Sequence, residues 1–240
     1  MSDYRNDKST CTFYSKIGAC RHGEKCSRAH IKPISSETLL LANLYQNPKL
    51  NKNDAEELSA KQIQESFDHF YKDIFLKFAS LGHVEALVVC ENENNHLNGN
   101  VYVKFRSKDA AYNACMELNQ SWFGGRPVHS EFSPVESFHE ANCRAHETDT
   151  CTRGDHCNFM HIRNPNSHLR GILFRAQEKS RIVKALQELK KDEEKEKESA
   201  KVEQEQQQQQ QSQEQQPPMS SLDTVPTTTS AAAVAALFSK

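Results

Sequence analysis

The chain has 240 residues, 36% of them hydrophobic, and a formal net charge of −2, so its length allows one ordinary domain plus small modules. It has no run of 18 apolar residues and no apolar N-terminal segment of the signal-peptide kind, so we expect neither a membrane span nor secretion. Positive charge is concentrated in two segments. Residues 1–32 carry seven basic and three acidic residues, and residues 139–184 carry eight and five. Such local basic segments are typical of phosphate contact, which the whole-chain charge hides.

The same pattern of three cysteines and one histidine occurs twice, within residues 1–34 and within residues 139–165. Its spacing is Cys-x8-Cys-x5-Cys-x3-His in the first copy and Cys-x7-Cys-x5-Cys-x3-His in the second. Gly23 and Gly154 stand at the same offset, where a tight loop needs a positive φ angle. Three thiolates and one imidazole form the closed tetrahedral shell that a structural zinc prefers. A disulfide framework or chance is the alternative, and two matched spacings disfavour both. We therefore expect two zinc ions, the first held by Cys11, Cys20, Cys26 and His30 and the second by Cys143, Cys151, Cys157 and His161.

Residues 35–138 are expected to form a central domain that begins with a short helix over residues 35–47. The apolar stripe of this helix starts at Leu40, and Pro48 ends it. A polar loop then leads to a first strand near Glu57–Ala60.

The clearest helical pattern spans residues 61–81, where apolar side chains recur at steps of three and four and Gly82 follows at the C-cap position. Alternating apolar residues, caps and glycines indicate the elements that follow. They are, in order, a strand over residues 83–90, a polar turn over 91–98, a strand over 100–105, a helix over 107–119, a turn at Gly124-Gly125 and a strand over 126–132.

The order β-α-β-β-α-β is that of the RNA recognition motif, so the expected fold class is α+β, with this domain between the two fingers. The strand that should carry the RNA-stacking aromatics reads Asn98-Gly99-Asn100 where a basic residue, glycine and an aromatic are usual. Tyr102 and Phe105 remain. Residues 33–138 also carry nine basic and fourteen acidic residues. We therefore expect the sheet to be a poor RNA platform and the domain to bind protein.

An amphipathic helix is expected over residues 166–190, after the second finger. Its basic flank, which includes Arg170 and Arg175, is either a solvated rim on a packed helix or an RNA contact. Glutamate and lysine, then glutamine, dominate the chain beyond it and predict a disordered tail over residues 193–240. The expected domains are thus residues 1–34, 35–138, 139–165, 166–192 and 193–240.

A finger, an RNA-recognition-like domain and a second finger, in that order, resemble the small subunit of the U2 snRNP auxiliary factor, a pre-mRNA splicing factor family. The resemblance covers residues 10–175. It is carried by FYSKIGACRHGEKCSR, VYVKFR, WFGGRPVHSEFSPV and CTRGDHCNFMH. It implies a nuclear protein that recognises the AG dinucleotide of single-stranded pre-mRNA at the 3′ splice site through both fingers and heterodimerises with a large subunit. Many members end in an Arg/Ser-rich segment, which this chain replaces with glutamine, glutamate and lysine, so it looks like a fungal-type member.

The resemblance also implies a U2AF-homology motif, a modified RNA-recognition domain that grips a Trp-containing peptide of the large subunit. Phe123 matches the Phe of the family's Arg-x-Phe loop, while Ser121 stands at the Arg position. Asp73 fits the acidic helix face of the family, whereas Lys77 has the opposite charge. Trp122 matches the residue that the family inserts among partner prolines. The alternative is a Trp122 buried in the core.

Single-stranded bases are read by stacking on aromatic or guanidinium planes and by hydrogen bonds to their edges. Side chains of these kinds stand beside the ligands of both fingers, although each arginine could instead contact phosphate or solvent. We expect RNA contacts from Phe13, Arg21, Ser27, Arg28, Arg144, Arg153, Asn158 and Phe159. His22, His146 and His156 are not expected to be ligands, because each shell is already full.

Two other functional classes compete with this hypothesis. One is a protein-interaction adaptor whose fingers are purely structural. The other is an enzyme, which we do not expect, because both metal shells are closed and offer no position for a catalytic water.

Overall fold

The structure is a computed structural model that describes residues 9–50 and 58–214. The chain divides into two compact units, Met1–Val183 and Lys184–Lys240, and the first contains both cysteine clusters and the central sheet. Within the described ranges, no helix has the length and apolar character needed to cross a bilayer.

The centre of the first unit is a five-stranded antiparallel sheet with the strand order β6-β1-β3-β2-β7. The first four of these strands have the order of an RNA recognition motif, and β7 is added from the segment after the second cluster. A separate hairpin joins β4 (Trp122–Phe123) to β5 (Arg126–Pro127). The sheet strands are β1 (Thr38–Leu41), β2 (Val84–Cys90), β3 (Val101–Phe105), β6 (Ser130–Phe132) and β7 (Ile162–Arg163).

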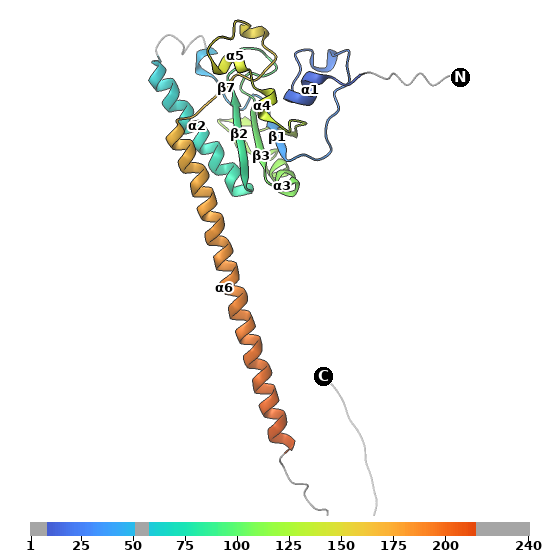
Figure 1. The fold of residues 1–240 in the computed structure, drawn as a ribbon, viewed down its shortest axis with the longest axis vertical. Coiled ribbons are helices and arrows are strands. Elements are labelled where there is room, and N and C mark those ends of the chain that lie inside the picture. Colours follow the sequence, from blue (N-terminus) through green and yellow to red (C-terminus); the bar gives the residue numbers. More distant parts are fainter. Residues whose placement is uncertain (1–8, 51–57, 215–240) are drawn as a thin grey trace, which may run out of the picture. The chain divides into compact units, whose positions relative to one another are not determined.

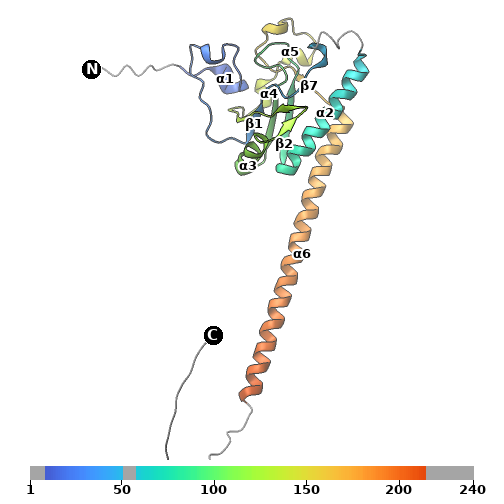
Figure 2. The same ribbon diagram turned by 180° about the vertical axis from the view of Figure 1, so that it is seen from behind.

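Helices α2 (Ala60–Leu81) and α3 (Lys108–Leu118) contribute to the larger core, which also contains Leu39, Leu41, Val101, Val103 and Phe105 of the sheet. Both helices begin at a serine cap: the Ser59 side chain accepts from the Gln62 amide and the Ser107 side chain from the Ala110 amide. Figure 1 shows α2 beside the strands, and Figure 2 shows the same arrangement from behind. The buried members of this core from the helices are Phe67, Tyr71, Ile74, Phe75 and Phe78 of α2 and Ala111, Ala114, Cys115 and Leu118 of α3.

The other core joins the sheet to both cysteine clusters. Tyr102 of β3 is fully buried in it, and its hydroxyl donates to the Ile17 carbonyl at 2.8 Å. Ile17 ends α1 (Thr12–Ile17), the helix of the first cluster, and Met160 comes from the second. The face on which an RNA recognition motif stacks bases is therefore covered by the chain's own fingers, as the prediction of a poor RNA platform requires.

The helix expected over residues 35–47 is wrong, because Thr38–Leu41 is strand β1. Leu39 and Leu41 belong to the helix-covered core and Leu40 to the other core. A strand buried on both faces does not alternate in polarity, so its leucines resemble a helical stripe. The strand expected near Glu57–Ala60 is also wrong within the described residues, because Ser59 caps α2 and Ala60 begins it; Glu57 lies outside them.

Four other expected elements are confirmed: the helices over residues 61–81 and 107–119, as α2 and α3, and the strands over 83–90 and 100–105, as β2 and β3. The expected strand over 126–132 is divided, because its start pairs in the hairpin and its end in the sheet.

The C-terminal helix α6 (Ser167–Glu214) begins where it was expected but continues beyond residue 190. Residues 193–214, expected in the disordered tail, are therefore helical. The remaining tail, residues 215–240, lies outside the described residues.

The remaining short elements lie in and around the two clusters and in one loop. They are η1 (Gly23–Lys25), η2 (Pro48–Leu50), α4 (Phe138–Ala141), α5 (Arg144–Glu147) and η3 (Gly154–His156).

Candidate metal centres and nucleic-acid interface

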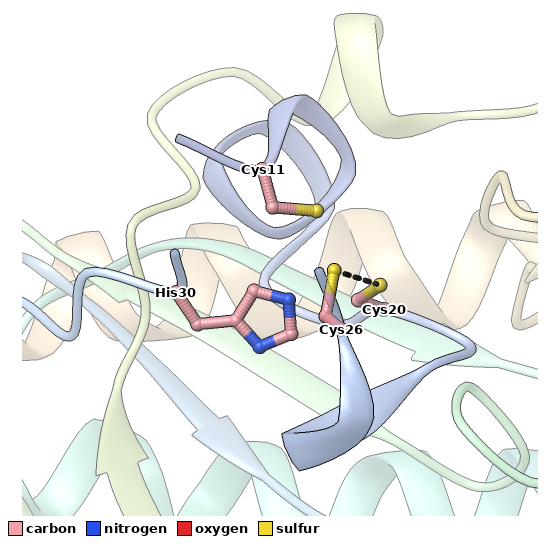
Figure 3. A group of neighbouring side chains, drawn as sticks. All are labelled: Cys11, Cys20, Cys26 and His30. Carbon is pink, nitrogen blue, oxygen red and sulfur yellow. Dashed lines mark hydrogen bonds between the residues drawn. The ribbon is translucent and has the colours of Figure 1, made fainter. Parts of the chain in front are cut away.

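The four expected ligands of the first finger converge. One ligand atom from each of them lies within 4.8 Å of all the others, and Figure 3 shows the side chains gathered around a common centre. The sulfur atoms of Cys20 and Cys26 are 3.9 Å apart. The Nε2 atom of His30 is buried and has no hydrogen-bond partner among the described residues. A metal ion at the centre of the cluster would provide the missing partner.

The second finger has the same geometry. The Cys143 sulfur lies 3.7 Å from that of Cys157 and 3.8 Å from that of Cys151, which is 3.4 Å from His161 Nε2. Zinc–sulfur bonds of ~2.3 Å and zinc–nitrogen bonds of ~2.0 Å in a tetrahedron place two sulfurs about 3.8 Å apart and a sulfur and a nitrogen about 3.5 Å apart. Both clusters therefore fit zinc, with every ligand supplied by the chain.

Each finger presents its third cysteine from a tight turn. The turns η1 and η3 begin at Gly23 and Gly154, and both glycines have a φ angle of 48°. The Cys26 amide then donates to the Gly23 carbonyl, and the Cys157 amide to the Gly154 carbonyl, each at 3.3 Å. The expected positive φ at this offset is confirmed, since glycine adopts it without a Cβ clash.

An aromatic ring stacks on the histidine ligand of each finger. Tyr14 lies on His30 with ring centroids 4.4 Å apart, and His146 lies on His161 at 4.1 Å. Tyr14 and His146 each stand three residues after the first cysteine of their own finger. This shared offset is visible in the sequence, but the stacking on the histidine ligand was not predicted from it. His146 is not in the ligand cluster; its Nε2 atom lies 3.3 Å from a carboxylate oxygen of Glu91.

Burial shifts the pKa of the histidine ligand and of two cysteine ligands in opposite directions. The shift favours metal binding at the histidine and opposes it at the cysteines. Burial, aided by nearby His146, lowers the pKa of His161, so its imidazole is neutral and free to bind. Burial raises the pKa of the Cys20 and Cys143 thiols to about 11. These thiols must lose a proton when zinc binds, so metal binding and proton release are coupled.

Two buried asparagines of the 91–98 segment hold the second finger against the sheet. Asn92 donates to the Phe159 carbonyl at 2.9 Å and accepts from the His161 amide at 2.8 Å. Asn94 donates to the Cys157 carbonyl at 2.8 Å. The sequence predicts only a polar turn here, although asparagine recurs at several of its positions.

The two fingers contact each other through four of the residues expected to bind RNA. The guanidinium of Arg21 donates from Nε to Asn158 Oδ1 at 2.9 Å, and also to the His156 carbonyl at 2.5 Å. The rings of Phe13 and Phe159 meet edge to face, with centroids 6.3 Å apart. The structure thus joins side chains that are about 140 residues apart in sequence into one surface.

A groove of about 600 Å³ lies beside this junction and is lined by three of the expected RNA residues, Arg144, Arg153 and Phe159. Lys16 and His139 also line it, although the sequence does not predict either as an RNA contact. A groove that combines cationic side chains with an aromatic ring suits an unpaired nucleic-acid strand. The other two expected contacts, Ser27 and Arg28, are exposed on the first finger and do not line this groove.

A second, mostly apolar pocket of about 240 Å³ lies on the helix-covered side of the sheet. Phe123 lines it and packs edge to face on Phe70, with ring centroids 5.6 Å apart. Trp122, at its rim, is 72% exposed, so the alternative of a core tryptophan is wrong. The pocket is lined by Leu41, Leu44, Ile74, Lys77, Phe78, Leu118, Ser121, Trp122, Phe123 and Val128.

The charges near this pocket differ from the pattern that the resemblance implies. Lys77 forms an ion pair with Glu117 at 2.6 Å, and the Ser121 hydroxyl donates to the Glu117 carbonyl. Asp73 is exposed on α2 and does not line the pocket. Of the three expected partner-binding residues, the structure therefore places two at the pocket and one on the helix beside it.

Comparisons with known proteins agree with this architecture. Residues 6–32 match the family described as zinc finger C-x8-C-x5-C-x3-H type (and similar), and residues 67–129 match the RNA recognition motif. The chain is 48% identical over 186 residues to the splicing factor U2AF 23 kDa subunit of Schizosaccharomyces pombe, a match that covers 78% of this chain and 86% of that protein. It is 46% identical over 182 residues to the splicing factor U2af 38 kDa subunit of Drosophila melanogaster, covering 73% and 69%. It is 47% identical over 173 residues to the splicing factor U2AF 26 kDa subunit of Bos taurus, covering 70% and 79%.

Proposed function

We propose a function for this chain from one premise: it belongs to the family of U2AF small subunits, whose named relatives are splicing factors. We propose that it is a nuclear, non-catalytic splicing-factor subunit that recognises the AG dinucleotide at the 3′ splice site through both zinc fingers. We further propose that it heterodimerises with a large subunit through the apolar pocket. The observation that carries the RNA proposal is the contact between the fingers, which makes one surface from two modules.

The RNA proposal rests on the chemistry of that surface. Phe13 and Phe159 offer aromatic rings at the junction, and Arg144 and Arg153 add positive charge along the adjoining groove. Stacking and phosphate contact are the two main sources of affinity for single strands. Three more side chains, Ser27, Arg28 and Asn158, carry the hydrogen-bonding groups that base recognition needs.

The partner proposal rests on the shape and lining of the apolar pocket. Its volume of about 240 Å³ and its apolar side chains suit one large aromatic side chain of a partner peptide. Phe123 would pack on that side chain from the hairpin, and the exposed Trp122 would contact the peptide beyond it. Asp73 would contribute a negative charge one turn before Lys77.

The RNA proposal is tested by fluorescence anisotropy with the zinc-loaded protein. The probes are a labelled single-stranded RNA containing UAG and a control in which AG is replaced by CC. We expect tighter binding of the UAG strand, and weaker binding after Arg28→Gln. The matched control is Arg106→Gln, an exposed arginine at the end of β3, which should bind as the wild type does. Equal affinity for both strands would refute AG recognition, and no binding at moderate salt would favour the adaptor with purely structural fingers.

A further inference from the structure

The contact between Arg21 and the second finger is specific in its chemistry. Arg21 is exposed on the first finger, yet its guanidinium makes two hydrogen bonds across the junction, one to the Asn158 side chain and one to the His156 backbone. A guanidinium presents a rigid fork of donors, so two bonds from one side chain fix both direction and distance. Arg21 therefore adds a directional contact between two fingers that the core around Tyr102 already attaches to the sheet.

The same contact determines which way the Asn158 amide faces. A guanidinium has only donors, so the Asn158 atom 2.9 Å from Arg21 Nε must be the amide oxygen. The amide nitrogen then faces away from Arg21, and it has no hydrogen-bond partner among the described residues. Asn158, which is half-buried, thus keeps its acceptor engaged and has two N–H donors left for a ligand.

The backbone on both sides of Asn158 is fixed as well. Asn94 donates to the carbonyl of the preceding residue, Cys157, and Asn92 donates to that of the following residue, Phe159. The central domain therefore positions the main chain of Asn158, while the first finger orients its side chain. This is the arrangement expected of a group that is preorganised for a ligand.

We infer that Arg21 is a positioning residue, which joins the two fingers before RNA arrives and turns the Asn158 amide so that it donates to acceptor atoms on a base edge. This inference rests on the proposed function, in which one RNA strand contacts both fingers. It assigns Arg21 a role different from that of Arg28, which lies on the same finger and is free to contact the strand directly.

The orientation of the fingers is tested first without RNA. In the zinc-loaded full chain, NMR should show a nuclear Overhauser contact between the rings of Phe13 and Phe159, which meet edge to face. Arg21→Met keeps the length of the side chain but removes its donors, and should abolish this contact. Arg28→Met is the matched control and should keep it. Asn158→Asp should also keep it, because a carboxylate still accepts from Arg21.

RNA binding then separates positioning from direct contact, with the labelled UAG strand as the probe. Arg21→Met should weaken binding about tenfold without changing the dependence on salt, whereas the loss of one phosphate contact would lower the salt slope by about 0.7. Asn158→Asp should also weaken binding, because it keeps the junction but loses the donors. Arg21→Met combined with Asn158→Ala should weaken binding no more than the stronger single change.

Three outcomes would overturn the inference. The first is an intact ring contact in Arg21→Met together with a salt slope lowered by about 0.7, which would make Arg21 a phosphate ligand. The second is wild-type affinity in Arg21→Met despite a lost ring contact, and the third is wild-type affinity in Asn158→Asp. If the wild-type chain binds no RNA, the proposed function fails, and with it the role in presenting Asn158 to a base. The ring contact still decides separately whether Arg21 joins the fingers.

Discussion

The substitution Tyr102→Phe tests whether the sheet is a scaffold that stabilises the first finger. Tyr102 is fully buried, and its hydroxyl donates at 2.8 Å to the carbonyl of Ile17 at the end of α1. Phenylalanine keeps the ring but leaves this carbonyl without its donor in a buried position. An unsatisfied buried acceptor costs about 1–3 kcal/mol, so we expect the free energy of unfolding to fall by about 2 kcal/mol.

Urea denaturation of the zinc-loaded chain measures this loss. With an m-value of about 2 kcal/mol per molar urea, a loss of about 2 kcal/mol lowers the midpoint by about 1 M. The free zinc concentration must be the same throughout, because a ligand of the folded state raises the midpoint. The control is Tyr112→Phe on α3, because Tyr112 is 55% exposed. Its free energy of unfolding should differ from that of the wild type by no more than about 0.5 kcal/mol, as is usual for a surface substitution. Equal midpoints for Tyr102→Phe and the wild type would refute the reasoning.

Three further predictions concern the pocket and the metal centres. Phe123→Ala should weaken binding of a Trp-containing large-subunit peptide by about 2 kcal/mol in calorimetry with both zinc ions retained, and unchanged affinity would exclude this pocket as the binding site. Cys26→Ser should lower the zinc content by one ion per chain in elemental analysis and weaken binding of the UAG strand; two retained ions would contradict the ligand assignment. Zinc affinity should rise with pH, because burial raises the pKa of the Cys20 and Cys143 thiols to about 11 and each must lose a proton to bind. Competition with a chelator between pH 6 and 8 measures this slope, and a flat profile would show that these thiols are not ligands.

The metal ligands were predictable from the sequence because zinc sites are encoded locally. Cys20, Cys26 and His30 lie close together along the chain, so their side chains can meet around one ion. Three cysteines and one histidine at such spacings are typical ligands of zinc. The same holds for α2, whose buried side chains recur along one face and whose start is capped by Ser59. Periodicity fails at Thr38–Leu41, because a strand between two cores has no exposed face to reveal it.

The junction of the fingers could not be predicted, because it depends on contacts between distant parts of the chain. Arg21 and Asn158 each had the chemistry of an RNA contact, and nothing in their own segments showed that they meet. The buried Asn92 and Asn94 are a similar case, since polar side chains in a loop usually face water. A cluster of asparagines can instead satisfy backbone groups of a neighbouring module, and here it does.

On the proposed function, the burial of Tyr102 also explains how one small domain could serve two ligands. The core around Tyr102 fixes the fingers to one face of the sheet, whereas Leu41, from the core shared with the helices, lines the apolar pocket. Because β1 contributes Leu40 to the core around Tyr102 and Leu41 to the pocket, the attachment of the fingers and the pocket lie on opposite faces of the sheet. On the proposed function, an RNA strand on the fingers and a peptide in the pocket therefore occupy different faces and do not compete for the same side chains. The fingers thus cover the face of the sheet that would stack bases, while the apolar pocket on the helix-covered side remains open for the proposed partner.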